Sequence, residues 1–421
     1  MVFGPDIEFF AGLQHVSYII VKMMIIPLLF FAHSVLQVGP GRIYESITKA
    51  VEVAQPGDVI AVYPSLNSYP GTQVSINKAN LTIEGMGPRP IRIVGDNFNY
   101  DGVGSTPRAV FQLNSSGNGF TLKNFDISGA HNDSFNGAGV RINAANNVTI
   151  THCLIHGNDM GIMSNGLVKN EHAGENQVID HCTIFSNGTN KEPGQNHNLY
   201  LGGTSVTMQY CNVYGSTTGH NFKSRAHFNL IKYCQIHDAS NRELDLVEAW
   251  DTERPNSNTV LIGNIIIKDP NCQGNRGVIH FGAEKGTHVG TLYLFNNIIT
   301  TYFSTPLIML DSTKTNCVVD GNILTSTAPG NHYLFDLEQS ADISQVSGSN
   351  NWASSEINLP KQVGTNQRSE VTTNSSIRDE MNPPILPNQS DEYADGNGVK
   401  HKVNFDISQR PTHTVTDLTA R

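Results

Sequence analysis

The sequence predicts an all-β solenoid, in which short strands stack on one another with tight turns between them. Many short segments alternate apolar and polar residues, which is the period of a strand with one buried face. One position also recurs every 23 to 33 residues and holds either cysteine or asparagine. The chain has 38 glycines and 15% charged residues, a composition that favours a turn-rich β protein over a helical one.

The first 34 residues are predicted to form a signal peptide. Residues 25–32 make an apolar run, Lys22 precedes this run, and Ala32 and Ser34 are the small residues that fit cleavage after Ser34. The apolar run is too short to span a membrane comfortably. We therefore expect a secreted or periplasmic protein that has no stable membrane insertion after cleavage.

A short N-terminal capping helix is expected before the repeats begin. Residues 35–38 fit a first strand, residues 59–62 fit the next, and between them residues 44–54 place their apolar side chains on one helical face. Such a helix can cover the open end of a stack of strands. We assign the solenoid to residues 35–340 and interpret residues 341–421 as a capping or wrapping tail.

The repeated cysteine and asparagine position predicts an internal column. A residue that exchanges cysteine for asparagine at one place in a repeat is expected to be small and buried. The asparagine members are expected to bind backbone groups at a bend through their side chains. We expect no disulfide among the four cysteines of the column, and the column leaves Cys272 and Cys317 unassigned. Its members are Cys153, Cys182, Cys211, Cys234, Asn264, Asn297 and Asn322.

Four segments between residues 197 and 284 align as successive rungs, at 197–203, 220–225, 243–246 and 277–282. Alternation turns their apolar residues inward and leaves three rows of outward positions. We expect the middle row to point into solvent and to carry the chemistry. The rows are Asn198, Asn221, Glu243 and Val278; then Tyr200, Lys223, Asp245 and His280; then Gly202, Arg225, Val247 and Gly282.

The formal net charge of −10 argues against a nucleic-acid surface, which needs clustered lysine and arginine to neutralise phosphates. It allows an anionic substrate, because a local pair of cations such as Lys223 and Arg225 can dominate the field of a cleft.

The sequence resembles the right-handed parallel β-helix proteins of the pectate-lyase superfamily over residues 35–339. The resemblance rests on residues 39–47 (GPGRIYESI), 54–62 (AQPGDVIAV) and 81–85 (LTIEG), together with the cysteine and asparagine column. It implies a groove walled by loops and a polysaccharide partner. Many enzymes of this superfamily act on acidic polysaccharides, and its lyases remove a proton next to a uronate carboxyl group and expel the neighbouring sugar.

Lys223 is our candidate base, because like charges at Arg225 and His220 are expected to lower its pKa. The Lys223–Ser224 pair resembles a Lys-Ser motif of the lyase family that includes chondroitinase B and several alginate lyases. In that family the lysine is the base and an upstream Glu-x-Glu pair binds calcium. Here the acidic pair, Glu243 and Asp245, follows the lysine instead of preceding it. The resemblance implies that this pair binds Ca²⁺, although its position in the chain departs from the family's order. The alternative for Lys223 is a structural ion pair with Asp245.

The remaining candidates follow from the chemistry that an elimination needs. Arg225 suits a uronate carboxylate, with pairing to Glu248 or Glu243 as the alternative. Tyr200 can donate to the leaving oxygen, act as a base or form a wall against sugar. Three histidines are candidate acids. We also expect substrate contacts from the polar and aromatic side chains near the middle row. The candidate acids are His197, His220 and His280. The expected substrate contacts are Asn198, Asn221, Glu284 and Trp250.

Three alternatives remain open beside the lyase. An inverting glycoside hydrolase would use carboxylates such as Asp245, Glu243 or Glu284 as acid and base, although the signature rungs of polygalacturonases are missing. A uronate epimerase would share the proton-abstraction step. A non-catalytic glycan-binding surface protein would use the same row as a polar ladder.

Overall fold

The computed structural model describes residues 33–71, 74–96, 98–103, 108–168, 171–191, 194–284, 287–364 and 391–411. The predicted signal peptide lies outside the described residues, except for its last two positions. Residues 34–421 form one unit, to which every element below belongs. No helix in the described part of the chain combines the length and apolar composition of a membrane span.

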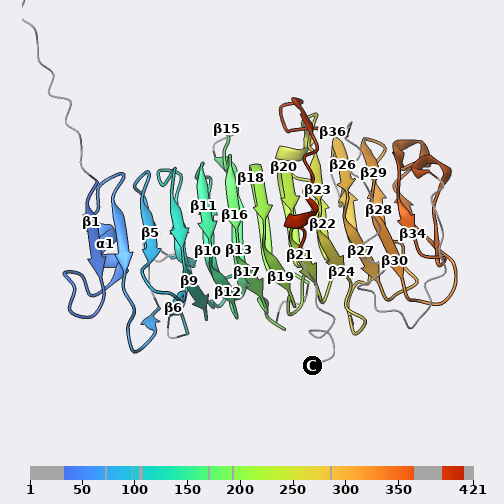
Figure 1. Cartoon of the computed structure of the whole chain (residues 1–421). Helices are drawn as coiled ribbons and strands as arrows, with labels where there is room; N and C mark the ends of the chain where they lie inside the picture. The colour runs from blue at the N-terminus through green and yellow to red at the C-terminus, as the bar shows by residue number, and fades with distance from the viewer. Residues whose placement is uncertain are drawn as a thin grey trace, which may run out of the picture. The chain divides into compact units, whose positions relative to one another are not determined.

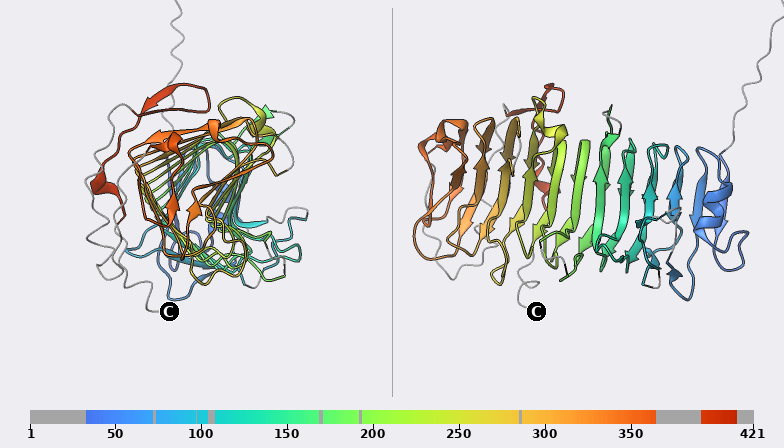
Figure 2. Two further views of the ribbon diagram at one scale, coloured as in Figure 1. Left: turned by 90° about the vertical axis from the view of Figure 1, so that its right-hand side faces the viewer. Right: turned by 180° about the vertical axis from the view of Figure 1, so that it is seen from behind.

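Parallel strands stack in register along one axis and form three faces around a common interior, as Figures 1 and 2 show. The fold is therefore a parallel β-helix, as predicted. Two strands of 11 residues each, β18 and β20, bend from the first face onto the second and pair along both. The first face contains β4 (Val74–Ile76), β7 (Ala109–Leu113), β10 (Ala138–Asn143), β13 (Met160–Asn165), the first halves of β18 (Leu199–Gln209) and β20 (Phe222–Lys232), β22 (Leu244–Val247), β25 (Ile279–Gly282), β28 (Ile308–Asp311) and β32 (Phe335–Glu338).

The other two faces complete each turn of the chain. The second face contains β1 (Val35–Val38), β2 (Val59–Val62), β5 (Thr82–Gly85), β8 (Thr121–Lys123), β11 (Val148–Thr151), β16 (Gln177–Asp180), the second halves of β18 and β20, β23 (Thr259–Ile262), β26 (Gly290–Phe295), β29 (Thr315–Asp320) and β33 (Val346–Ser349). The third face contains β3 (Tyr69–Pro70), β6 (Ile91–Val94), β9 (Phe125–Ser128), β12 (Leu154–His156), β17 (Thr183–Phe185), β19 (Asn212–Tyr214), β21 (Gln235–His237), β24 (Ile265–Ile267), β27 (Ile298–Thr301), β30 (Ile323–Ser326) and β34 (Trp352–Ala353).

One helix, three short strand pairs and four 3-10 turns are present in the described residues in addition to the three faces. Helix α1 (Ile47–Val53) buries Ile47, Ala50 and Val51 beside β1, and its role as a cap stays a prediction. The other short elements are the pairs β14 (Leu167–Val168) with β15 (Glu171–His172), β31 (His332–Tyr333) with β35 (Ile357–Asn358) and β36 (Glu392–Ala394) with β37 (Lys400–Lys402), and the 3-10 turns η1 (Trp250–Glu253), η2 (Ile343–Gln345), η3 (Lys361–Val363) and η4 (Ile407–Gln409).

The predicted column of cysteines and asparagines is confirmed. The backbone N–H of Cys211 donates to the Sγ of Cys234 at 3.4 Å, and the N–H of Cys234 donates to the Oδ1 of Asn264 at 2.9 Å. The asparagine part of the column runs on from Asn264 to Asn351 by the same contact. Each of these column side chains therefore accepts the buried backbone N–H of the rung before it, a group that would otherwise be costly to leave unpaired.

The stack continues beyond residue 340, so the repeats end later than predicted. Strand β33 pairs with β29, and β34 pairs with β30. Residues 391–411 then return to the second face, where Val403 packs with Val260 and Phe295 in a small apolar cluster. Figure 2 shows this C-terminal segment along the side of the stack.

Candidate active site

The predicted middle row exists in the expected register on the first face. Tyr200 pairs with Lys223, Lys223 with Asp245, and Asp245 with His280 across β18, β20, β22 and β25. Their predicted exposure is wrong for three of the four, because Lys223, Asp245 and His280 are only 8%, 1% and 3% exposed. These side chains bind one another and the charged residues around them, and together they form a closely packed cluster.

Asp245 is the centre of this cluster. Its Oδ2 lies 2.8 Å from Lys223 Nζ and 3.3 Å from His220 Nε2. Its Oδ1 lies 2.9 Å from His280 Nδ1 and 3.2 Å from a guanidinium nitrogen of Arg242. Burial alone would raise the pKa of Asp245, but the hydrogen bond from His280 and the nearby Lys223 hold it well below its usual range. Asp245 is thus a buried carboxylate that its partners keep ionised at neutral pH.

Lys223 binds a second carboxylate on its outer side. Its Nζ lies 2.6 Å from Glu284 Oε1, while the other carboxylate oxygen of Glu284 lies 2.7 Å from Arg225 Nη2. Burial by itself lowers the pKa of Lys223, but Asp245 and Glu284 outweigh it and raise that pKa above its usual value. The predicted lowering is therefore wrong, since the neighbouring anions act on Lys223 more strongly than the cations.

Arg225 connects this ion-pair network to Tyr200. Its Nε donates to the phenol oxygen of Tyr200 at 3.1 Å, and its Nη1 donates to the backbone carbonyl of Glu248. The expected alternative partner of Arg225, a carboxylate of Glu248 or Glu243, is replaced in the structure by Glu284. Tyr200 is partly buried, and its phenol oxygen, held by a guanidinium, is placed for proton transfer to or from a ligand.

Two of the three predicted acids are held neutral. His197 and His220 stack with ring centroids 4.9 Å apart, and His197 Nδ1 accepts the backbone N–H of His220. Burial, together with nearby Lys223, lowers the pKa of His197 far below its usual value and that of His220 to about 4. Neither ring is therefore a protonated imidazolium that could act as the acid at neutral pH. His280 lies between two carboxylates, with Asp311 3.3 Å from its Nε2.

The predicted row of Asn198, Asn221 and Glu243 is buried, so the substrate contacts expected of Asn198 and Asn221 are wrong. The Nδ2 of Asn198 donates to Asn221 Oδ1 at 2.8 Å, and the Nδ2 of Asn221 donates to Glu243 Oε2 at 2.6 Å. All three side chains are fully buried. Trp250 differs, because it begins η1, which packs against β18 and β20, and the residue is 71% exposed. Its contact with substrate stays a prediction.

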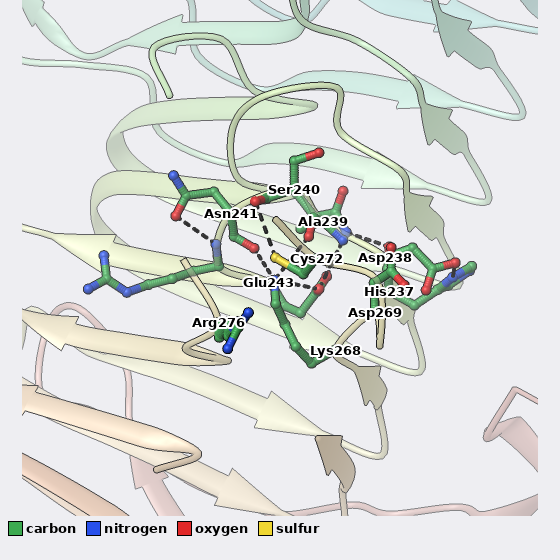
Figure 3. A network of polar contacts seen from close by, with 12 residues as sticks. His237, Asp238, Ala239, Ser240, Asn241, Glu243, Lys268, Asp269, Cys272 and Arg276 are labelled. Carbon is green, nitrogen blue, oxygen red and sulfur yellow. Dashed lines mark hydrogen bonds and ion pairs between the residues drawn. The ribbon is translucent and has the colours of Figure 1, made fainter. Parts of the chain in front are cut away.

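Glu243 and Asp245 do not fit the implied calcium site. Figure 3 shows Glu243 beside Lys268, whose fully buried Nζ lies 3.5 Å from Glu243 Oε1. The same oxygen accepts the backbone N–H of Ala239 at 2.9 Å. Asp245 is likewise surrounded by cationic partners. Within the described residues, no three histidine, cysteine or acidic side chains come together as a metal site would require.

Glu243 is expected to make stability fall with rising pH. Burial raises its pKa from 4.5 to about 7, although Lys268 opposes the shift. The folded state therefore holds a proton that the unfolded state has released, and this contribution is lost as the pH rises from about 4.5 to about 7. Urea unfolding at about pH 5 and about pH 8 should show this loss in the wild type and a smaller loss in Glu243→Gln. Equal pH dependence in the variant and in the exposed control Glu253→Gln would contradict it.

Sequence reasoning missed Arg242 and Asp311, which also belong to the cluster. Arg242 immediately precedes Glu243 in the chain, and its second guanidinium nitrogen reaches Met309 Sδ at 3.4 Å. Asp311 lies on β28, the rung after His280, and pairs with Gly282, so it extends the predicted row that contains Arg225 and Gly282. Extending the aligned rows by one more rung would have identified Asp311. A search for charges at turn positions would have identified Arg242.

Comparisons with known proteins find structures of similar fold. No family model and no curated protein matches the chain. Similar structures include pectate lyase Pel9A, with 14% identity over 80% of this chain and 77% of that chain and a TM-score of 0.48. An endo-xylogalacturonan hydrolase from Aspergillus tubingensis has 11% identity over 80% and 99% of the two chains and a TM-score of 0.47. An alginate lyase from Paenibacillus sp. has 14% identity over 80% and 98% and a TM-score of 0.43.

These similarities concern the fold alone. The strand pairing and the ion pairs together define the chain as a parallel β-helix protein with a charged, partly accessible cluster of side chains on its first face.

Proposed function

We propose that this chain is a carbohydrate-active enzyme, a polysaccharide lyase that cleaves an acidic, uronate-containing glycan by β-elimination. One observation carries the proposal: Lys223 and Arg225 bind the two oxygens of one carboxylate, that of Glu284, at 2.6 and 2.7 Å, directly beside Tyr200. Two cations arranged around a carboxylate are what a lyase needs in order to stabilise the charge that develops on a uronate. Export of the chain, predicted from its first 34 residues, is part of the same proposal.

The reaction needs a base, a proton donor for the leaving oxygen and cations at the carboxylate. A base takes the proton from the carbon next to the carboxylate, and the released electron pair forms a double bond to the neighbouring carbon. The bond from that carbon to the glycosidic oxygen breaks, and the departing oxygen receives a proton. Cations at the carboxylate lower the barrier because negative charge moves onto it in the transition state.

We assign these three roles to residues of the cluster. Lys223 and Arg225 neutralise the uronate carboxylate, and Asp245 holds Lys223 in place from the buried side. Tyr200, whose oxygen is held by Arg225 Nε, takes the proton from the carbon as it passes a proton to the departing glycosidic oxygen, so that its hydroxyl is unchanged at the end of the reaction. This assignment replaces Lys223 as the base, since its two anionic partners keep the ammonium protonated.

The carboxylate geometry disfavours the inverting hydrolase. The nearest oxygens of Asp245 and Glu284 both lie within 2.8 Å of the same Lys223 nitrogen. They are therefore closer together than the ~6.5–9.5 Å that an inverting pair needs to accommodate a water molecule. The pKa of each is held below its usual value, that of Glu284 because Lys223 and Arg225 outweigh its burial, so neither is a protonated acid.

The test is incubation with a panel of uronate polymers, including polygalacturonate, alginate and chondroitin. A lyase produces an unsaturated uronate, seen as growing ultraviolet absorbance together with new chain ends. New reducing ends without absorbance would overturn the proposal in favour of hydrolysis, and inverted uronate configuration without cleavage would favour an epimerase. Binding without any chemical change would favour the glycan-binding protein.

A further inference from the structure

The pair of cations proposed to receive the substrate is occupied by a residue of the chain itself. We use the name cation cradle for Lys223 Nζ and Arg225 Nη2, which hold the two oxygens of Glu284. A carboxylate bound through both oxygens to two different cations reproduces the contacts that a uronate carboxylate would make there. Glu284 thus carries the same functional group as the proposed ligand, a carboxylate, and occupies the position in which that ligand would bind.

The two anions of the cradle differ in accessibility. Asp245 lies on the inner side of Lys223 and is 1% exposed, whereas the Glu284 side chain is 37% exposed. Glu284 also lies beyond Gly282, the last residue of β25, so no strand pairing holds it. Of the two carboxylates bound to Lys223, Glu284 is therefore the one that solvent and an incoming carboxylate can reach.

The cradle has other anchors that do not depend on Glu284. Lys223 keeps its ion pair with Asp245 at 2.8 Å. Arg225 keeps Tyr200 at 3.1 Å and the carbonyl of Glu248. If the Glu284 carboxylate leaves, these contacts still hold both cations, and Lys223 Nζ and Arg225 Nη2 each have one hydrogen-bond donor released for a new carboxylate.

We propose that Glu284 is an internal stand-in for the substrate carboxylate, which a uronate of the glycan must displace in order to bind. The inference rests on the proposed function, because it takes the cation cradle to be the uronate subsite. Neutral sugars cannot displace Glu284, since they offer no anion to replace the two ion pairs. Glu284 therefore selects for carboxylated ligands, and it lowers their apparent affinity by the fraction of molecules in which the cradle is closed.

Acetate is the probe, because it carries the carboxylate without any assumption about the glycan. In the Glu284→Ala protein, acetate is expected to fill the vacated place and raise the melting temperature saturably, by about 2 °C or more, relative to chloride at equal ionic strength. The wild type and Glu253→Ala, which lacks an exposed glutamate of η1 outside the cradle, should show no such rise. If acetate affects all three proteins equally, the proposal is overturned.

A second variant covers the case in which Glu284→Ala does not fold. Glu284→Gln keeps the shape of the side chain and removes its charge, and it should bind trigalacturonate about tenfold more tightly than the wild type, as expected when a competing closed state is removed. Unchanged or weaker binding would overturn the proposal. These readouts need no turnover, so a protein without lyase activity whose cradle gains acetate would refute the lyase and leave the role of Glu284 standing.

Discussion

Asp245→Asn is expected to lower the free energy of unfolding by about 3–5 kcal/mol, the usual cost of removing one partner from a buried ion pair. The buried carboxylate has four partners, two of which are the cations Lys223 and Arg242. A neutral amide removes the anion that these two cations share and leaves Lys223 with Glu284 as its carboxylate partner. Urea unfolding at neutral pH measures the change, and the proposed lyase should lose turnover as well because Lys223 loses its inner anchor.

The matched control for this substitution is Asp336→Asn. Asp336 stands three rungs beyond Asp245 along the same row, after His280 and Met309, and is half-exposed. Its replacement should change stability by about 0.5 kcal/mol or less. The wild type should also lose the Asp245 contribution as the pH falls below about 4, because a carboxyl whose pKa is lowered by folding stabilises the protein only while ionised. Equal acid sensitivity of Asp245→Asn would contradict the ion-pair account.

Tyr200→Phe is expected to lower the turnover number on a uronate polymer by about 10²- to 10⁴-fold, the range for loss of a proton-transferring group. The ring and its edge contact with His197, at 5.3 Å between centroids, are retained, so the protein should unfold at nearly the same urea concentration. The substrate concentration for half-maximal rate should change little, because the cation cradle is intact. Initial rates of ultraviolet absorbance measure both quantities.

The control for the tyrosine is Tyr210→Phe, which removes a hydroxyl from the stacked rings of Tyr210 and Tyr233 at another corner of the stack. It should leave the rate unchanged. If Tyr200→Phe keeps full turnover and instead weakens substrate binding, Tyr200 is a wall against sugar and the proton is transferred by another group.

The register of the site was predictable because strand repeats are local and regular. The steps from Tyr200 to Lys223 and on to Asp245 are nearly equal, and the longer step to His280 is taken up by loops. The exposure of the row was not predictable. Alternation shows which side of a sheet a residue occupies, but Arg242 and Glu284, which bind the row, come from segments outside the strands.

The same reasoning explains why the row of Asn198, Asn221 and Glu243 was misplaced. Strands β18, β20 and β22 begin at Leu199, Phe222 and Leu244, one residue after each member of that row. These three residues therefore belong to turns, where the alternation of a strand does not apply, and their side chains run along the axis and bind one another. Turn geometry of this kind depends on the whole stack and cannot be derived from a single rung.

The five strands that carry the charged cluster, β18, β20, β22, β25 and β28, lie in the interior of the stack, with further rungs on both sides. In a solenoid each rung is supported mainly by its two neighbours, so fraying or truncation spreads inward from the ends. The outer rungs can therefore unfold before the strands that carry the charged cluster are affected. Partial loss of the ends should reduce the far-ultraviolet dichroism of the protein before it reduces turnover.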